Sequence, residues 1–343
     1  MMQSRYFCGS TTLATMSDFT RQPVSFPASV AFLDDSVAFL SALRSMFADT
    51  HTHHFFSHPG QALDFVMRNG YPAMGVRLAG RDFAAVDCGA GNAVGDDIME
   101  DRNRFQSVAA VVVDYEMPEI DGLTFLSQLK GIDCTRILLT GKAGAPEAVD
   151  AFNAGLIDYY LKKSDAEMIV KLRALLGEAR RKHCMSRGLV SVHDTGAVYS
   201  RPETIAVLEN LARRESIAEY YWRPDGNAIL TFGAAGEAGI FLAWDETDWA
   251  LQCDVIADEG GPRELLDEMN ARRTMPVFWP HQAYRPGAQI VRYALPHAID
   301  GLAGAFYSWT RVDGVDLVSR PLTFAEWRLE QQLHGSDSCA VQP

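Results

Sequence analysis

The chain has 343 residues, of which 48% are hydrophobic, and it carries 31 basic and 44 acidic residues, a net charge of −13. This composition is typical of a globular protein of about two domains and excludes a disordered chain. The acidic charge disfavours nucleic acid and anionic membranes as partners, because both are negatively charged. The excess is largest after residue 188, where 12 arginines and no lysine stand against 22 acidic residues.

No segment has the pattern of a membrane helix, a signal peptide or a disulfide framework. The apolar runs fall well short of the roughly 20 residues that span a bilayer, and the N-terminus lacks the apolar region of a signal peptide. The six cysteines are scattered and form no C-x-x-C pair, which is typical of reduced thiols. We therefore expect a cytoplasmic protein with a flexible tail over residues 1–27, in which Met16 offers an alternative start.

The first half of the chain alternates short apolar runs with helical patterns. The expected strands cover 29–35, 53–56, 109–114, 136–141 and 157–163, and the expected helices cover 36–49, 59–69, 123–130, 146–154 and 165–182. A long segment at 70–107 interrupts the alternation and predicts one more helix near 96–105. Strands that alternate with helices predict a parallel sheet with helices on both faces.

Four histidines in HTHHFFSH (51–58) leave two interpretations open. They could form a metal site, since imidazole is a common ligand of transition metals. The segment is favoured instead as a strand with its flanks, because alternate side chains of a strand face opposite sides of the sheet.

Polar side chains end the predicted strands. Asp34 and Asp35 end the first strand, Asp114 the third, Thr140 the fourth and Lys162 the fifth. Ligands of such sheets bind at the carboxyl ends of the strands, so we expect these side chains to meet in one site. Crowded carboxylates repel one another, and a hard cation such as Mg²⁺ relieves that repulsion. A carboxylate beside such a cation can act as a nucleophile toward a phosphoryl group.

The order of these residues resembles the receiver domain of two-component response regulators. The matching pieces are FLDDS, VVVDYEMPEIDG, LLTG and DYYLKK, and the resemblance covers about residues 29–180. It implies a doubly wound, flavodoxin-like sheet of five parallel strands. It also implies that Asp114 accepts a phosphoryl group from a sensor histidine kinase, and that Mg²⁺ is held by Asp34, Asp35, Asp114 and the main-chain carbonyl of Glu116.

The same resemblance assigns the residues that respond to the phosphate. Thr140 and Lys162 would contact it, Thr140 and Tyr159 would form the switch, and Glu116 and Lys142 would tune its lifetime. Gly122 matches the glycine after the phosphoacceptor loop. One departure is Lys163, which stands where receivers usually have proline. A second departure is length: 79 positions separate Asp35 from Asp114, which we attribute to an insertion over about 70–107.

The second half of the chain predicts an α+β domain. Helices are expected at 202–215, 246–257, 263–273 and 323–334, three antiparallel strands within 217–244, and further strands at 276–279, 288–293 and 303–311. All six tryptophans lie here. They could form a ligand pocket or a partner surface, but an aromatic core is favoured. The layout and the segment EYYWRPDGNAILTF are similar to response regulators of α-hydroxyketone quorum-sensing systems.

The sequence thus predicts a receiver domain over 28–183, an α+β output domain over 184–335 and a flexible tail over 336–343. We expect a homodimer switched by phosphorylation, without catalysis beyond phosphorylation and dephosphorylation of the receiver itself. Three kinds of output remain open: protein interactions or dimerisation, an enzyme or small-nucleotide-binding domain controlled by the receiver, and a DNA-binding transcription regulator, which the acidic charge disfavours.

Overall fold

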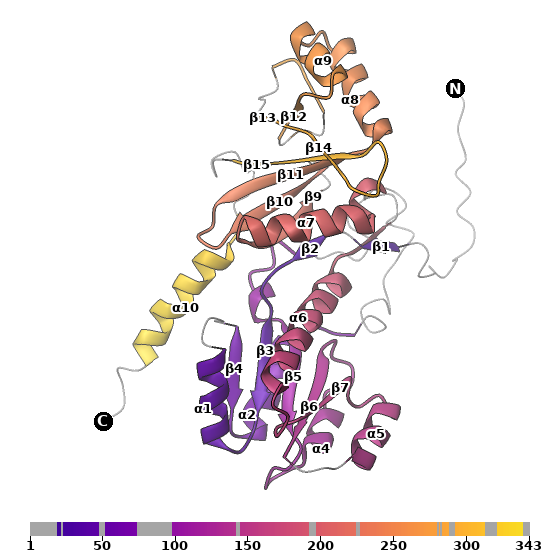
Figure 1. The fold of residues 1–343 in the computed structure, drawn as a ribbon. Coiled ribbons are helices and arrows are strands. Elements are labelled where there is room, and N and C mark those ends of the chain that lie inside the picture. The colour runs from indigo at the N-terminus through magenta and orange to yellow at the C-terminus, as the bar shows by residue number, and fades with distance from the viewer. Residues whose placement is uncertain are drawn as a thin grey trace, which may run out of the picture.

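The structure is a computed structural model. It describes residues 19–21, 23–47, 52–73, 98–141, 145–191, 197–223, 227–279, 281, 283–287, 292–312 and 321–338. Two domains are visible in Figure 1, a parallel sheet wrapped by helices and an antiparallel sheet with helices on both sides.

The first domain contains the predicted five-stranded parallel sheet. Its strands lie in the order β4-β3-β5-β6-β7, and every neighbouring pair is parallel. The strands are β3 (Ser29–Leu33), β4 (His53–Phe56), β5 (Val108–Asp114), β6 (Thr135–Thr140) and β7 (Tyr159–Lys162). The central strand β5 is buried along its whole length, as its apolar sequence predicts for a strand covered on both faces. The doubly wound fold predicted from the sequence is confirmed.

Helices cover both faces of this sheet, and alternation along the strands decides which face each residue packs on. In β3, Val30 and Phe32 pack with α1 and α6, whereas Ala31 and Leu33 pack with α2, α4 and α5. The helices are α1 (Val37–Met46), α2 (Pro59–Asn69), α4 (Gly122–Ser127), α5 (Ala145–Asn153) and α6 (Met168–Arg187). The long helix α6 runs from this domain toward the second one (Figure 1).

The second domain is built on a six-stranded antiparallel sheet in the order β14-β15-β11-β10-β9-β2. Its strands from the C-terminal half are β9 (Ile217–Arg223), β10 (Ala228–Gly233), β11 (Ala238–Trp244), β14 (His297–Ala298) and β15 (Phe306–Arg311). Helix α7 (Pro202–Arg214) packs on one face, and α8 (Glu246–Asp258), α9 (Arg263–Asn270) and α10 (Phe324–Ser338) contribute to the core on the other. The predicted α+β architecture is confirmed.

The N-terminal segment does not behave wholly as the predicted flexible tail. Strand β2 (Val24–Ser25) pairs with β9 and forms one edge of the second sheet. Strand β1 (Phe19–Arg21) pairs with β8 (Leu189–Ser191), and Phe26 is buried. The sequence prediction was wrong from residue 19 onward, because a strand of two or three residues is too short to show a periodic pattern.

The predicted insertion, 70–107, lies between α2 and β5, and most of it, 74–97, falls outside the described residues. Residues 98–100 form a turn, and η3 (Arg104–Gln106) is a short 3₁₀ helix, so the helix predicted near 96–105 is wrong. The remaining elements are η5 (Ala197–Ser200) and the pair β12 (Met275–Val277) and β13 (Arg292–Ala294).

Five of the six tryptophans are buried, and the sixth, Trp309, is partly buried, as expected of an aromatic core. The predicted C-terminal helix begins at a capping box, since the Thr323 N–H donates to Glu326 and the Glu326 N–H to Thr323. It runs through Ser338, past the start of the predicted tail at residue 336. Within the described part of the chain, no helix is both long and apolar enough to cross a membrane.

Candidate functional site

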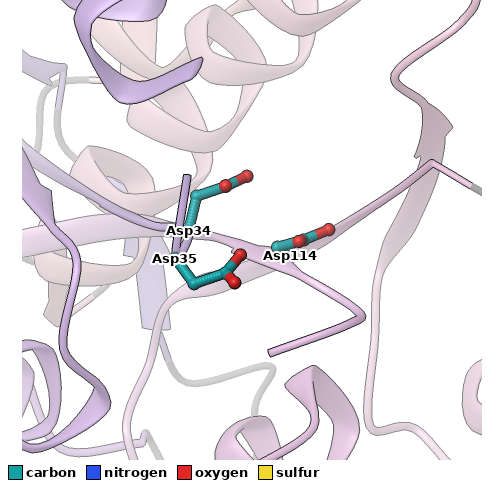
Figure 2. A group of neighbouring side chains, drawn as sticks. All are labelled: Asp34, Asp35 and Asp114. Carbon is teal, nitrogen blue, oxygen red and sulfur yellow. The ribbon is translucent and has the colours of Figure 1, made fainter. Parts of the chain in front are cut away.

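Three aspartates meet at the carboxyl ends of β3 and β5. Asp34 and Asp35 directly follow β3, and Asp114 is the last residue of β5. One carboxylate oxygen of each lies within 4.8 Å of the other two, and Figure 2 shows the three neighbouring side chains. Asp34 and Asp114 are buried while Asp35 is exposed. The sequence prediction that these side chains share one site is therefore correct in its geometry.

The start of α1 fixes the direction of the Asp34 side chain. Ser36 caps this helix, because its hydroxyl oxygen accepts the Phe39 N–H. The Ser36 N–H in turn donates to Asp34 Oδ1 at 2.9 Å. One oxygen of Asp34 is thereby held by the helix N-terminus, and the other faces the interior of the site.

The lysine that reaches the acidic residues is Lys163, and not Lys162 as the sequence analysis assigned. The Lys163 ammonium lies 2.6 Å from Asp34 Oδ2 and 2.9 Å from Asp114 Oδ1. It also lies 4.6 Å from the centre of the Phe39 ring, in cation–π contact. Lys162 is exposed.

Alternation along β7 explains this one-residue correction. Leu161 packs on the face covered by α1 and α6, and Tyr160 packs on the opposite face. Lys162 follows Tyr160 on that opposite face, because side chains two apart in a strand point the same way. Lys163 is the next residue, and its N–H donates to the Thr140 carbonyl at 2.8 Å. This bond places Lys163 at the strand ends, whereas the resemblance to receivers, in which proline usually follows the lysine, implied Lys162.

Burial and the ion pairs shift the pKa values of Asp114 and Lys163 in opposite directions. Burial raises the pKa of Asp114, and Asp34 raises it further, although the bonds from Lys163 work against both effects. Burial alone would lower the pKa of Lys163, but its bonds to Asp34 and Asp114 outweigh burial and raise it. The positive charge of Lys163 therefore offsets the repulsion between the two close carboxylates of Asp34 and Asp114.

Thr140 and Gly122 complete the environment of Asp114. Thr140 is the buried last residue of β6, the strand beside β5. Gly122 begins α4, and its N–H donates to the Tyr115 carbonyl at 2.9 Å. A Cβ atom on Gly122 would lie 2.3 Å from the Asp114 carbonyl oxygen, so only glycine allows the helix to approach β5 this closely.

Three further predicted residues are Tyr159, Glu116 and Lys142. Tyr159 begins β7, packs with the α1 and α6 core and hydrogen-bonds Glu178; burial first, and then this bond, raises its pKa. Glu116 is exposed in the loop after β5. Lys142 lies outside the described residues.

The histidines of the second strand pack as a structural cluster. Arg180 hydrogen-bonds His53 Nε2 at 2.8 Å, and His54 Nε2 lies 3.1 Å from the Ser29 hydroxyl. Burial lowers the pKa of His53 to about 3 and that of His54 to about 4, so both are neutral near pH 7. The favoured interpretation as a strand is confirmed by β4.

The second domain has a small aromatic-lined cavity between its sheet and β12. Trp244, Phe278, Trp279 and His281 contribute to its lining, and its volume is about 10 Å³. This is close to the space of a single water molecule, far below the several hundred Å³ of a ligand pocket. The cavity therefore gives no support to a nucleotide-binding site at this place.

Comparisons with known proteins agree with the first domain. Residues 87–173 match the family described as response regulator receiver domain. This match contains Asp114, Thr140 and both adjacent lysines, but it begins after Asp34 and Asp35. The transcriptional regulatory protein FlgR of Helicobacter pylori is 30% identical over 92 residues, which are 26% of this chain. The chain spans only about a quarter (24%) of the length of that relative.

A solved structure resembles both domains together. The response regulator LqsR of Legionella pneumophila matches with a TM-score of 0.67 and 23% identity, over 90% of this chain and 95% of LqsR. At this level of identity the likeness shows that the two share a fold. It covers the C-terminal domain as well as the parallel sheet.

Proposed function

We propose that this chain, which contains a response regulator receiver domain, is a signalling protein controlled by phosphorylation of Asp114. The observation that carries the proposal is the set of three aspartates at the ends of β3 and β5, with the Lys163 ammonium bonded to two of them. A sensor histidine kinase is the partner that supplies the phosphoryl group in two-component systems. We place the protein in the cytoplasm.

Mg²⁺ fits the donor set of this site. Three carboxylates with oxygens within 4.8 Å of one another suit a small, hard cation that prefers oxygen ligands. Asp34, Asp35, Asp114 and the main-chain carbonyl of Glu116 would hold it. When bound, the cation supplies positive charge that neutralises the phosphoryl oxygens in the transition state.

The phosphoryl transfer uses one carboxylate oxygen of Asp114 as nucleophile. This oxygen forms a bond to phosphorus while the bond from phosphorus to the donor breaks, and the donor's leaving group departs with that electron pair. Lys163 stays as a charge partner for the phosphate oxygens, and the Thr140 hydroxyl donates a hydrogen bond to one of them. These roles pass from Lys162 to Lys163 because the Lys163 ammonium lies at Asp114.

The output we propose is a change of partner on the face formed by α5, β7 and α6, with homodimerisation as its readout. Large apolar side chains are exposed on two of its helices, namely Val149 and Phe152 on α5 and Val170 on α6. Exposed apolar side chains on one face support association with another protein surface. Thr140 and Tyr159, on the adjacent strands β6 and β7, would couple the phosphate to this face.

The layout of a receiver followed by this α+β domain supports a role in quorum sensing. LqsR has the same fold over 90% of the chain, and the sequence resembles response regulators of α-hydroxyketone systems. A purified sensor kinase from such a system, labelled with radioactive phosphate, would be expected to pass the label to this protein. Retention of all label on the kinase would count against this assignment.

Intact mass spectrometry tests the central proposal. Wild type and Asp114→Asn, which keeps the shape of the side chain, are incubated with acetyl phosphate and Mg²⁺. The wild type is expected to gain one phosphoryl group, Asp114→Asn none, and chelation of the metal to abolish the gain. Light scattering of the same samples then reports whether phosphorylation increases the dimer fraction. A phosphoryl gain in Asp114→Asn equal to that of the wild type would refute Asp114 as the acceptor.

A further inference from the structure

The receiver and the C-terminal domain share a continuous interface at the amino ends of the parallel strands. The chain passes between the domains more than once: β2 belongs to the C-terminal sheet but leads directly into β3, and α6 leads back toward the C-terminal domain (Figure 1). The end of the insertion, 98–107, lies in the same interface, since Ile98 and Phe105 belong to the core of the C-terminal sheet.

A buried ion pair lies at the centre of this interface. Arg104 is the first residue of η3, the short helix before β5, and its side chain is fully buried. Its guanidinium donates to Tyr221 Oη at 2.7 Å and to Glu219 Oε2 at 3.3 Å, both on strand β9 of the C-terminal sheet. It also donates to the Asp101 carbonyl at 3.0 Å and to the Leu322 carbonyl.

The acidic partner of this pair is equally enclosed. Glu219 has a side chain only 1% exposed. Its Oε1 accepts the Phe324 N–H at 2.6 Å, and its Oε2 accepts the Tyr221 hydroxyl at 2.5 Å. The Glu219 carboxylate therefore bonds both the Arg104 guanidinium of the insertion and the N–H of Phe324, the first residue of α10. Separating the domains would leave each charge buried without its partner, or would expose both to water.

Aromatic rings and a second ion pair surround this polar centre. Phe105 packs against Phe324 and Trp327 at ring-centre distances of 5.3 and 5.6 Å. Phe26 stacks on Tyr221, with centres 6.4 Å apart.

The second ion pair joins the end of α6 to the insertion, where Arg187 donates to Asp101 Oδ2 at 2.7 Å. Domains within one chain usually meet through polar interfaces that permit relative motion. Here the interface is a core with buried charge.

We propose that the Arg104–Glu219 pair is a latch that makes the receiver and the C-terminal domain one cooperative unit. The two domains then neither rotate freely nor unfold separately. A mutation that destabilises the receiver then also destabilises the C-terminal sheet. Arg104 lies in η3, shortly before the start of β5, and Asp114 is the last residue of β5. The proposal concerns the coupling of the domains, and it holds or fails independently of phosphorylation.

The distribution of tryptophan provides a reporter for this coupling. All six tryptophans lie at position 222 or later, so tryptophan fluorescence follows the C-terminal domain alone. Leu126 in α4 is fully buried in the receiver core formed with α2 and α5, which is distinct from the interface core. In full-length Leu126→Ala, a single cooperative unit predicts that the urea midpoint of tryptophan fluorescence falls by about 1 M. An unchanged fluorescence midpoint, with an earlier transition in circular dichroism, would overturn the proposal.

A second set of variants tests the latch itself. In the double variant Arg104→Met with Glu219→Leu, which removes both buried charges, Leu126→Ala should no longer shift the fluorescence midpoint. Arg102→Met is the matched control, because Arg102 is an exposed neighbour whose loss should leave the full shift. An unreduced shift in the double variant would refute Arg104–Glu219 as the latch.

Tyr221→Phe keeps this test decisive if the double variant does not fold. It removes only the hydroxyl that bonds both Arg104 and Glu219, and it preserves the ring in the core. The latch predicts that Leu126→Ala shifts the fluorescence midpoint less in this background than in the Arg102→Met control. Equal shifts in the two backgrounds would contradict the proposal.

Discussion

Replacing Lys163 by methionine should destabilise the receiver in the absence of metal and restore stability when Mg²⁺ is added. The Lys163 side chain is 19% exposed and bonds Asp34 and Asp114 at 2.6 and 2.9 Å. Removing one partner of a buried ion pair costs about 3–5 kcal/mol, and the lower end applies here because the ammonium retains some contact with water. Burial already raises the pKa of Asp114, so loss of the lysine should raise that pKa further.

The matched control is Lys162→Met, because Lys162 is an exposed neighbour of the same type. Urea unfolding followed by circular dichroism, with chelator or with Mg²⁺, measures both variants. We expect Lys163→Met to lose about 3 kcal/mol with chelator and Lys162→Met to stay within about 0.5 kcal/mol of wild type.

Phosphorylation of Lys163→Met by acetyl phosphate should also slow by roughly a hundred-fold, by analogy with the loss of one charge-stabilising donor. Equal stability and equal phosphorylation rates in the two variants, or a loss confined to Lys162→Met, would refute the assignment of Lys163.

Two further predictions concern the histidine cluster and the glycine at the start of α4. Burial lowers the pKa values of His53 and His54 to about 3 and 4, so below pH 6.5 the unfolded chain binds more protons than the folded protein. The free energy of unfolding should therefore fall as the pH drops from about 6.5 toward 4. At pH 5 the loss should be about 2 kcal/mol per histidine. Urea unfolding across this range should show a shallower slope in His54→Asn and an unchanged slope in the exposed control His58→Asn. Gly122→Ala should destabilise the receiver by at least about 2 kcal/mol, since its Cβ would meet a backbone carbonyl at 2.3 Å. Gly60→Ala, whose Cβ meets nothing within 4 Å, should be neutral or stabilising by about 0.5 kcal/mol; equal losses in both glycine variants would contradict the close approach of α4 to β5.

The parallel sheet and its acidic site could be predicted because the apolar pattern locates the strands and the parallel topology brings their carboxyl ends together. The apolar run before Asp114 predicts a strand buried on both faces, and the carboxyl ends of parallel strands meet at one edge of the sheet. Asp34 and Asp35 follow another such strand, so their proximity to Asp114 needs no side-chain detail. Thr140 was placed at the adjacent strand end by the same reasoning.

The errors arise where a single residue or a distant contact decides the structure. Lys162 and Lys163 are identical in type, and only the exact end of β7 determines which one faces Asp114. Strand β2 has two residues and takes its place through pairing with β9, about two hundred positions away. Arg104 lies in a polar stretch, and no residue near it in the sequence indicates that it pairs with Glu219, 115 positions later.

The most direct test of the phosphoacceptor is to identify the modified residue by chemical trapping. Protein phosphorylated with acetyl phosphate and Mg²⁺ is treated with borohydride, which reduces an aspartyl phosphate to homoserine, and the peptides are sequenced by mass spectrometry. The account predicts homoserine at position 114 and at no other aspartate, with none formed when the metal is chelated. Homoserine at Asp34 or Asp35 in place of Asp114, or stable phosphate on another type of residue, would contradict it.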